Sequence, residues 1–170
     1  EALVRARIEI SPDDVVVFLN SDVRAHRFFA DRIRGDVRED VYGPVINFQM
    51  VYGMWVPYLD GWCLAAKRST WDRLVVPGRG GPWDDVRYAH PYWEDNDLCL
   101  RAMRTGIALV LVAWPVLHKG ARTAGKTMKY GEGMERNRGT FARDVEVVWR
   151  ERMAGDGEAP NWPARKREAS

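Results

Sequence analysis

The apolar residues of the chain form short continuous runs that alternate with helical repeats, a pattern that predicts an α/β fold. Val15–Leu19 is a run of five apolar residues, which is typical of a strand buried on both faces in a parallel sheet. The runs 41–47 and 107–114 predict two more strands, and the run 63–66 predicts a shorter one. We therefore expect a mostly parallel sheet with Val15–Leu19 at its centre.

Residues 94–105 predict the helix around which the rest of the chain is organised. Asp95, Leu98, Cys99 and Ala102 follow the i, i+3, i+4, i+7 spacing of one helical face, so its three apolar members are expected in the core. Gly106 suits the left-handed position that commonly ends a helix. Helical patterns also occupy three other segments: 25–34, 69–74 and 134–153.

Length and composition predict one globular domain, since 170 residues with 46% hydrophobic and 29% charged residues are enough for a sizeable core. We expect this domain to span residues 1–154 and residues 155–170 to form a basic, disordered tail. Residues 1–10 have the spacing of the end of a helix, so the chain looks like one that lacks its front. The net charge of +2 gives no overall attraction to nucleic acid.

The two cysteines, Cys63 and Cys99, lack the spacing of a zinc site or a disulfide framework, and we expect two buried free thiols. No apolar run reaches the length that spans a membrane, and no signal peptide is recognised at the start. The expected location is the cytoplasm.

Polar residues follow two of the predicted strands. Asn20, Ser21 and Asp22 come directly after the first strand, where open α/β sheets bind ligands, so Asp22 is a candidate ligand of a metal or a substrate. The alternative is that these residues turn the chain and cap the next helix. His118 follows the strand 107–114 and is a second candidate ligand, although a lone histidine is more often structural.

Glu94 and Asp95 fall in the first turn of the helix 94–105. Acidic residues are favoured there by the helix dipole and need no further role. The same position also provides a fixed, ionised oxygen base that faces whatever precedes the helix. Both interpretations remain open on the local sequence.

Three segments taken in order resemble a known family. They are Asn20-Ser21-Asp22 after an apolar strand, Gly-Trp-Cys-Leu-Ala-Ala-Lys-Arg at 61–68, and Trp-Glu-Asp-Asn-Asp-Leu-Cys-Leu-Arg at 93–101 with His118 beyond the next strand. This arrangement resembles the second half of the family-2 inverting glycosyltransferases with the GT-A fold, over about residues 2–123. The resemblance implies a Rossmann-like GT-A domain that transfers a sugar from a nucleotide-sugar donor to an acceptor hydroxyl.

The resemblance implies a metal and donor site. Asp22 matches the family's strand-end acid that binds a divalent metal on the sugar-nucleotide diphosphate, and His118 matches a histidine that is a metal ligand in some members. Asn20, Ser21 and Gly61 correspond to donor-binding positions. Carboxylate oxygens suit hard cations, and one imidazole favours Mn²⁺ over Mg²⁺.

The resemblance also implies a base and an acceptor surface. Asp95 corresponds to the catalytic base that removes the proton of the acceptor hydroxyl, with Glu94 as the second candidate. Trp62, Trp93 and Asp97 correspond to the side that binds the acceptor, where the two indole rings could offer apolar faces to a sugar.

Two features depart from the family. Asn20 replaces the first acid of the strand-end motif, and the N-terminal half that holds the nucleotide base is absent. The chain is therefore a fragment, or another chain supplies that half, or the chain no longer turns over a sugar nucleotide. The alternatives to an enzyme are a non-catalytic interaction module on this scaffold and a nucleic-acid-associated protein, which includes sugar transfer to modified DNA bases.

Overall fold

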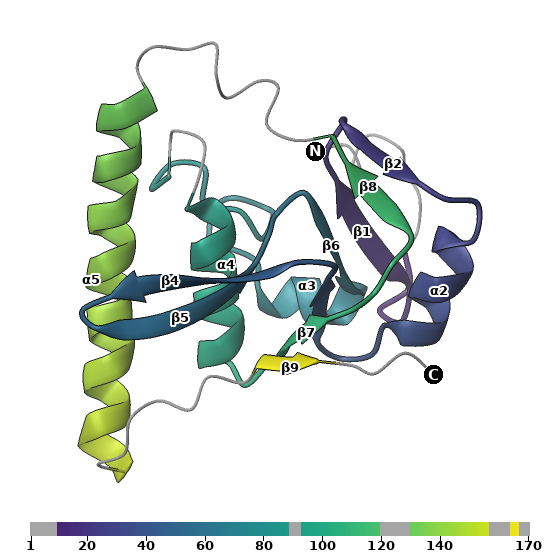
Figure 1. Cartoon of the computed structure of the whole chain (residues 1–170). Helices are drawn as coiled ribbons and strands as arrows, with labels where there is room; N and C mark the ends of the chain where they lie inside the picture. Colours follow the sequence, from purple (N-terminus) through teal and green to yellow (C-terminus); the bar gives the residue numbers. More distant parts are fainter. Residues whose placement is uncertain (1–9, 89–92, 120–129, 157–163, 167–170) are drawn as a thin grey trace.

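The computed structural model describes residues 10–88, 93–119, 130–156 and 164–166, and Figure 1 shows their arrangement. The described residues mix helices and strands, so the coarse expectation of a fold that combines α and β elements is confirmed, whereas the Rossmann-like GT-A arrangement stays a prediction. The elements in chain order are β1 (Val15–Leu19), β2 (Val23–Ala25), α2 (Phe29–Asp36), β3 (Val41–Gly43), β4 (Ile46–Val51), β5 (Met54–Leu59), β6 (Cys63–Lys67), α3 (Arg68–Arg73), α4 (Glu94–Arg104), β7 (Leu109–Leu111), β8 (Val116–His118), α5 (Tyr130–Asp156) and β9 (Ala164–Lys166).

The main sheet is mixed, with the strand order β1-β6-β3-β7-β9. β6 runs antiparallel to both β1 and β3, whereas β3, β7 and β9 run parallel to one another. The expectation of a mostly parallel sheet with β1 at its centre is therefore wrong. An apolar run reports burial but neither strand direction nor strand order, and four of the five β1 residues are only half-buried.

The predicted strand 41–47 is interrupted at Pro44, and the chain continues into a separate hairpin. This hairpin, β4–β5, turns through Tyr52 and Gly53, which both have positive φ angles of 49° and 76°. Two consecutive left-handed residues form the two-residue turn whose twist matches antiparallel strands. One face of the hairpin packs on α4 through buried residues that include Val51 and Val56.

The helix α4 confirms the predicted amphipathic pattern, because Leu98, Cys99 and Ala102 are fully buried. Gly106 has a φ of 77°, and the N–H groups of Gly106 and Ile107 donate to the carbonyls of Met103 and Ala102. These two bonds are the Schellman arrangement that ends a helix at a glycine. The helix is thus fixed at its C-terminus by the sequence feature that predicted its end.

The predicted strand 107–114 is shorter than expected. β7 covers only Leu109–Leu111, and the chain then forms β8, which pairs with β2 in a separate two-stranded ribbon. Figure 1 shows this ribbon and α2 at one end of the molecule and α5 at the other, with the β4–β5 hairpin crossing α4 toward α5.

The structure differs from the sequence-based boundaries at the C-terminal end of the chain. The last helix continues to Asp156, and residues 164–166 form β9 beside β7, so this part of the expected disordered tail belongs to the sheet. The helix expected at the start of the chain lies outside the described residues, apart from Ile10. Among the described helices, none combines the length and the apolar character that crossing a membrane requires.

Candidate functional site

Asp22 and His118 are brought together by the β2–β8 ribbon. Val23 lies opposite His118 in the antiparallel register, and the Lys119 N–H donates to the Asp22 carbonyl over 3.2 Å. The His118 Nε2 atom lies 3.2 Å from Asp22 Oδ1, and about a quarter of each side chain is exposed. The structure thus brings together two candidate ligands that come from distant segments of the chain. Their role as metal ligands stays a prediction.

Trp62 lies flat against the His118 ring. The two ring centroids are 4.8 Å apart and the planes differ by 10°. The Trp62 Nε1–H donates to Asp60 Oδ2 over 3.3 Å, and the Asn47 Nδ2–H donates to Asp60 Oδ1 over 2.5 Å. One face of the indole is thus occupied by His118, and the indole itself is oriented by Asp60. Trp62 therefore positions the histidine, and the indole is half-buried against the core cluster that contains Cys63.

Asp95 connects the start of α4 to the turn that precedes β6. Its Oδ2 accepts the Gly61 N–H over 3.2 Å, and its Oδ1 accepts the Asn96 N–H over 2.9 Å. A Cβ added to Gly61 would lie 3.1 Å from the Asp95 Cβ, closer than side-chain carbons ordinarily approach. A side chain at this position would therefore require Asp95 to move by a few tenths of an ångström.

The Asp95 carboxylate has features of both roles that the sequence left open, a cap of its own helix and an oxygen base. One oxygen bonds a backbone N–H of its own helix, as a cap would, and the other bonds a different segment. Burial raises the pKa of Asp95 to about 6, with a smaller contribution from the nearby Asp60 charge, and the two backbone N–H groups oppose the rise. A carboxylate with a pKa in this range is a stronger base than a solvated one and is still largely ionised at pH 7.

Three polar residues at the open end of the β4–β5 hairpin were missed by the sequence reasoning: Asn47, Tyr58 and Asp60. Asn47 and Tyr58 lie opposite each other in the hairpin register. Burial and the charges of Asp95 and Asp60 raise the pKa of Tyr58. The signal that could have found them is the placement of polar residues near the first and last positions of a mostly apolar segment, because a hairpin brings these positions together.

Asn20 and Ser21 lie exposed in the turn between β1 and β2, next to Asp22. The Asn20 N–H donates to the Trp62 carbonyl over 3.0 Å, and its carbonyl accepts the Val23 N–H over 3.2 Å. The backbone of this turn is therefore fixed on both sides while its side chains remain open. Glu94 lies partly buried at the first position of α4, beside Asp95.

Trp93 and Asp97, which were expected on the acceptor side, are both buried. Trp93 is 8% exposed and packs against Phe141 with ring centroids 5.5 Å apart. Asp97 forms an ion pair of 2.8 Å with Arg101, whose guanidinium also donates to the carbonyls of Leu74 and Pro82. The two residues stabilise α4 and its surroundings, and neither offers a surface to an acceptor. We do not include them in the candidate site.

Gly61 and Trp62 join the two parts of the site. Gly61 bonds the proposed base, and Trp62, the next residue, stacks on the proposed metal ligand. A single dipeptide between β5 and β6 thus carries contacts to both Asp95 and His118. The resemblance that motivated these residues placed them in three separate segments of the chain, and the structure brings the three segments together.

Asp22 and His118 supply one oxygen and one nitrogen, a donor set that suits a divalent transition metal such as Mn²⁺. In the part of the chain that the structure describes, no group of three or more His, Cys, Asp or Glu side chains could hold a metal ion. A cation here would therefore take its remaining ligands from water and from a bound ligand. Both cysteines are free and buried, as expected.

Comparisons with family models, with curated proteins and with solved structures find no match to this chain.

Proposed function

We propose that the chain carries the metal and base side of a metal-dependent inverting glycosyltransferase, which transfers a sugar from a nucleotide-diphosphate donor to an acceptor hydroxyl. The observation that carries the proposal is the Gly61–Trp62 dipeptide, which contacts Asp95 on one side and His118 on the other. This reaction needs two separate groups near each other: a base for the attacking hydroxyl and a cation for the departing diphosphate.

Asp95 is the proposed base. The acceptor hydroxyl gives its proton to the ionised carboxylate as its oxygen attacks the anomeric carbon, and the bond from that carbon to the diphosphate oxygen breaks. The raised pKa of Asp95 supports this role, because a stronger base accepts the proton more readily. Glu94, the preceding residue, is the second candidate.

Asp22 and His118 would hold the divalent cation, with Mn²⁺ preferred to Mg²⁺ because one ligand is an imidazole. When bound, the cation neutralises charge on the diphosphate. Trp62, itself oriented by the Asp60 carboxylate, stacks on the His118 ring and supports the orientation in which that ring faces Asp22. Asn20 and Ser21, exposed beside Asp22, would contact the donor.

We propose that the nucleotide base is bound by a segment that pairs with the outer edge of β1 and comes from the same polypeptide or from another chain. Among the described strands, β1 pairs only with β6, so its other edge has no strand partner. This open edge also supports the second candidate function, a non-catalytic interaction module. Two buried free thiols suit the reducing cytoplasm, which is the proposed location.

Manganese binding tests the proposal directly. The full chain is titrated with Mn²⁺, once without and once with a nucleoside diphosphate. Electron paramagnetic resonance measures the concentration of the free ion at each step. Asp22→Asn and His118→Ala should each weaken binding by at least the ~10–100-fold that loss of a supporting residue causes. Asp31→Asn is the matched control, because Asp31 is a largely exposed aspartate on α2. Equal binding by the Asp22 and Asp31 variants would contradict the metal site and leave the interaction module as the better function.

A further inference from the structure

The β4–β5 hairpin differs in composition from the rest of the chain. Its two strands, Ile46–Val51 and Met54–Leu59, and the Tyr52-Gly53 turn between them contain no Asp, Glu, Lys or Arg. In the whole chain, 29% of residues are charged. A projecting hairpin would ordinarily carry charges on its solvent side, so the outer surface of this hairpin requires an explanation.

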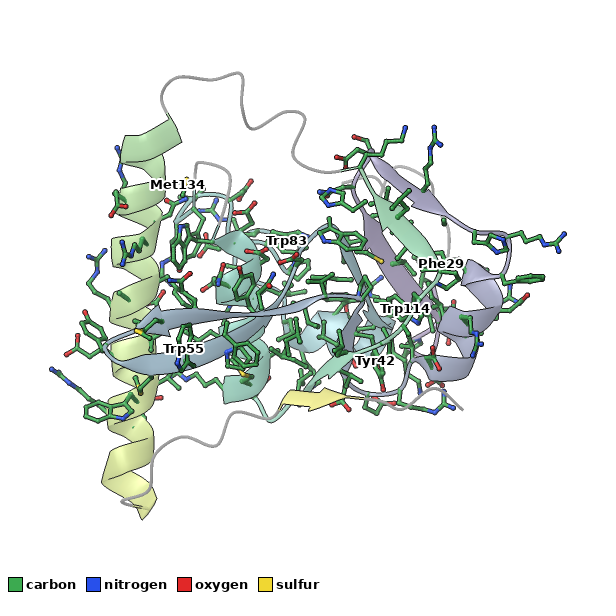
Figure 2. All side chains as sticks on the ribbon, viewed as in Figure 1. Phe29, Tyr42, Trp55, Trp83, Trp114 and Met134 are labelled. Atoms are coloured by element: carbon green, nitrogen blue, oxygen red, sulfur yellow. The ribbon has the colours of Figure 1, made fainter. Side chains whose placement is uncertain are left out.

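One side of the hairpin exposes large apolar side chains. Phe48, Met50 and Trp55 are 54%, 48% and 57% exposed, and Tyr52 at the tip is 64% exposed. Met50 lies opposite Trp55 in the register, which places these two side chains on the same face. Figure 2 labels Trp55 on the hairpin ribbon. We call the four residues Phe48, Met50, Tyr52 and Trp55 the hairpin face.

The hairpin face has the composition and size of an interface core. Tyr, Trp, Phe and Met are enriched at such cores, whereas Lys, Glu and Asp are depleted. With about half of each side chain exposed, its three aromatic residues offer roughly 350 Å² of surface. A stable interface buries roughly 800 Å² on each partner, so the face would supply a large part of its apolar centre.

The charges around the hairpin face favour a second copy of the chain as its partner. A face without charges meets its own copy without like-charge repulsion, and the net charge of +2 opposes association only weakly. Glu146 and Arg150 on the neighbouring helix α5 form an ion pair with each other. The hairpin lacks the lysines and arginines that attract anionic membrane surfaces or nucleic acid, so neither is favoured.

A recess lies beside the tip of the hairpin. Tyr52, Met54, Glu146 and Trp149 line a pocket of about 260 Å³ between the hairpin and α5. A two-fold interface uses the same surface on both copies, so it is favoured where one surface carries both projecting aromatic side chains and a recess. Tyr52 belongs to the hairpin face and to this pocket, which makes the two features continuous.

We propose that the chain forms a two-fold symmetric dimer in which the hairpin face of one copy packs on that of the other. The dimer is independent of the proposed sugar transfer. Its experiment is sedimentation equilibrium of the full chain over a concentration series, with Trp55→Glu and Met50→Lys as disrupting variants. Because a central aromatic residue commonly contributes about 2 kcal/mol, Trp55→Glu should raise the dimer Kd by roughly 30-fold or more.

Leu117→Glu is the matched control, since Leu117 is an equally exposed leucine (63%) on the distant β8 strand, and it should leave the dimer Kd unchanged. Circular dichroism checks that each variant is folded. A wild-type chain that remains monomeric throughout the series would overturn the proposal. So would a dimer that survives both hairpin substitutions. If the monomer instead sediments with phosphatidylcholine vesicles and Trp55→Glu abolishes this binding, the partner is a membrane surface. That result would also overturn the dimer.

Discussion

Gly61 lies directly against Asp95, and the absence of a side chain permits the contact. A Cβ at this position would lie 3.1 Å from the Asp95 Cβ. We expect Gly61→Ala to displace the carboxylate and to lower stability by roughly 1–3 kcal/mol, as overpacking does. Gly35→Ala is the control, because Gly35 in α2 has no atom within 4 Å of an added Cβ and should stabilise the helix by about 0.5–1 kcal/mol. Urea unfolding of both variants measures the difference, and equal effects would show that Asp95 moves aside for the added Cβ without cost.

Asp95 is the residue at which catalysis and capping can be separated. If the completed enzyme transfers sugar, Asp95→Asn should keep the fold and donor binding and lower turnover by ~10²–10⁴-fold. Turnover of the wild type should rise with pH through about 6, the pKa of Asp95, because only the ionised carboxylate accepts a proton. Glu94→Gln should have the smaller effect. Steady-state rates across pH test this, and unchanged turnover in Asp95→Asn would move the base to Glu94 or remove catalysis from this chain.

The same pKa predicts how stability depends on pH. Folding raises the pKa of Asp95 from 3.8 to about 6, so between these values the unfolded chain has released a proton that the folded chain retains. The free energy of unfolding therefore falls as the pH rises through this window, and the favourable contribution is present only below it. The difference in the free energy of unfolding between Asp95→Asn and wild type should therefore shift in favour of the variant by roughly 2–3 kcal/mol from pH 4 to pH 7. Urea unfolding at the two pH values measures the gain, and a constant difference would show that Asp95 is solvated.

The sequence pointed to some residues of the candidate site and missed others for identifiable reasons. Asp22 and His118 were found because each closely follows an apolar run, a position that the fold class connects with ligands. Trp93 and Asp97 were misplaced, since local spacing does not show that one packs on Phe141 and the other pairs with Arg101. Asn47 was missed because it meets Asp60 only through the hairpin register.

Among the elements, α4 was the most predictable. Its core face follows from the spacing of Leu98, Cys99 and Ala102, and its end follows from Gly106. The start is less regular, because Trp93 adopts a left-handed φ of 79° that its sequence does not indicate. The sheet was harder still, since strand direction depends on connections such as the β4–β5 hairpin, which lets β6 return antiparallel to β3.

The packing of α4 can be tested at Leu98, which is fully buried in the main core cluster. Leu98→Ala should lower the free energy of unfolding by roughly 2–5 kcal/mol, because the side chain leaves a cavity that its neighbours fill only in part. Leu117→Ala, at an exposed leucine on β8, should change stability by less than about 0.5 kcal/mol. Thermal and urea unfolding compare the two. Equal losses would show that Leu98 is not a core position.

At the scale of the whole molecule, β1 has a strand partner on one side only among the described strands, and the Trp71 Nε1–H donates to the Val16 carbonyl of β1 over 3.0 Å. The run Val15–Leu19 has the composition of an interior strand, yet it lies at the end of the strand order, and four of its residues are half-buried. An apolar edge strand without lysine, proline or a bulge is suited to pairing with another strand. The apolar composition of Val15–Leu19 led to the prediction of a central strand. That composition would fit a sheet with a further strand beside β1.

Hydrogen exchange tests whether that larger sheet forms. In an antiparallel pair, alternate N–H groups point to the partner strand and the others point away, so half of the β1 amides have no strand partner among the described residues. We expect these outward amides to exchange rapidly in this chain and to become protected when a polypeptide that supplies the base-binding half is present. The amides of β3, which lies between β6 and β7, are the control and should be protected in both states. Outward β1 amides already protected in the chain alone would show that the edge is covered, and the proposed pairing of a base-binding segment with β1 would be wrong.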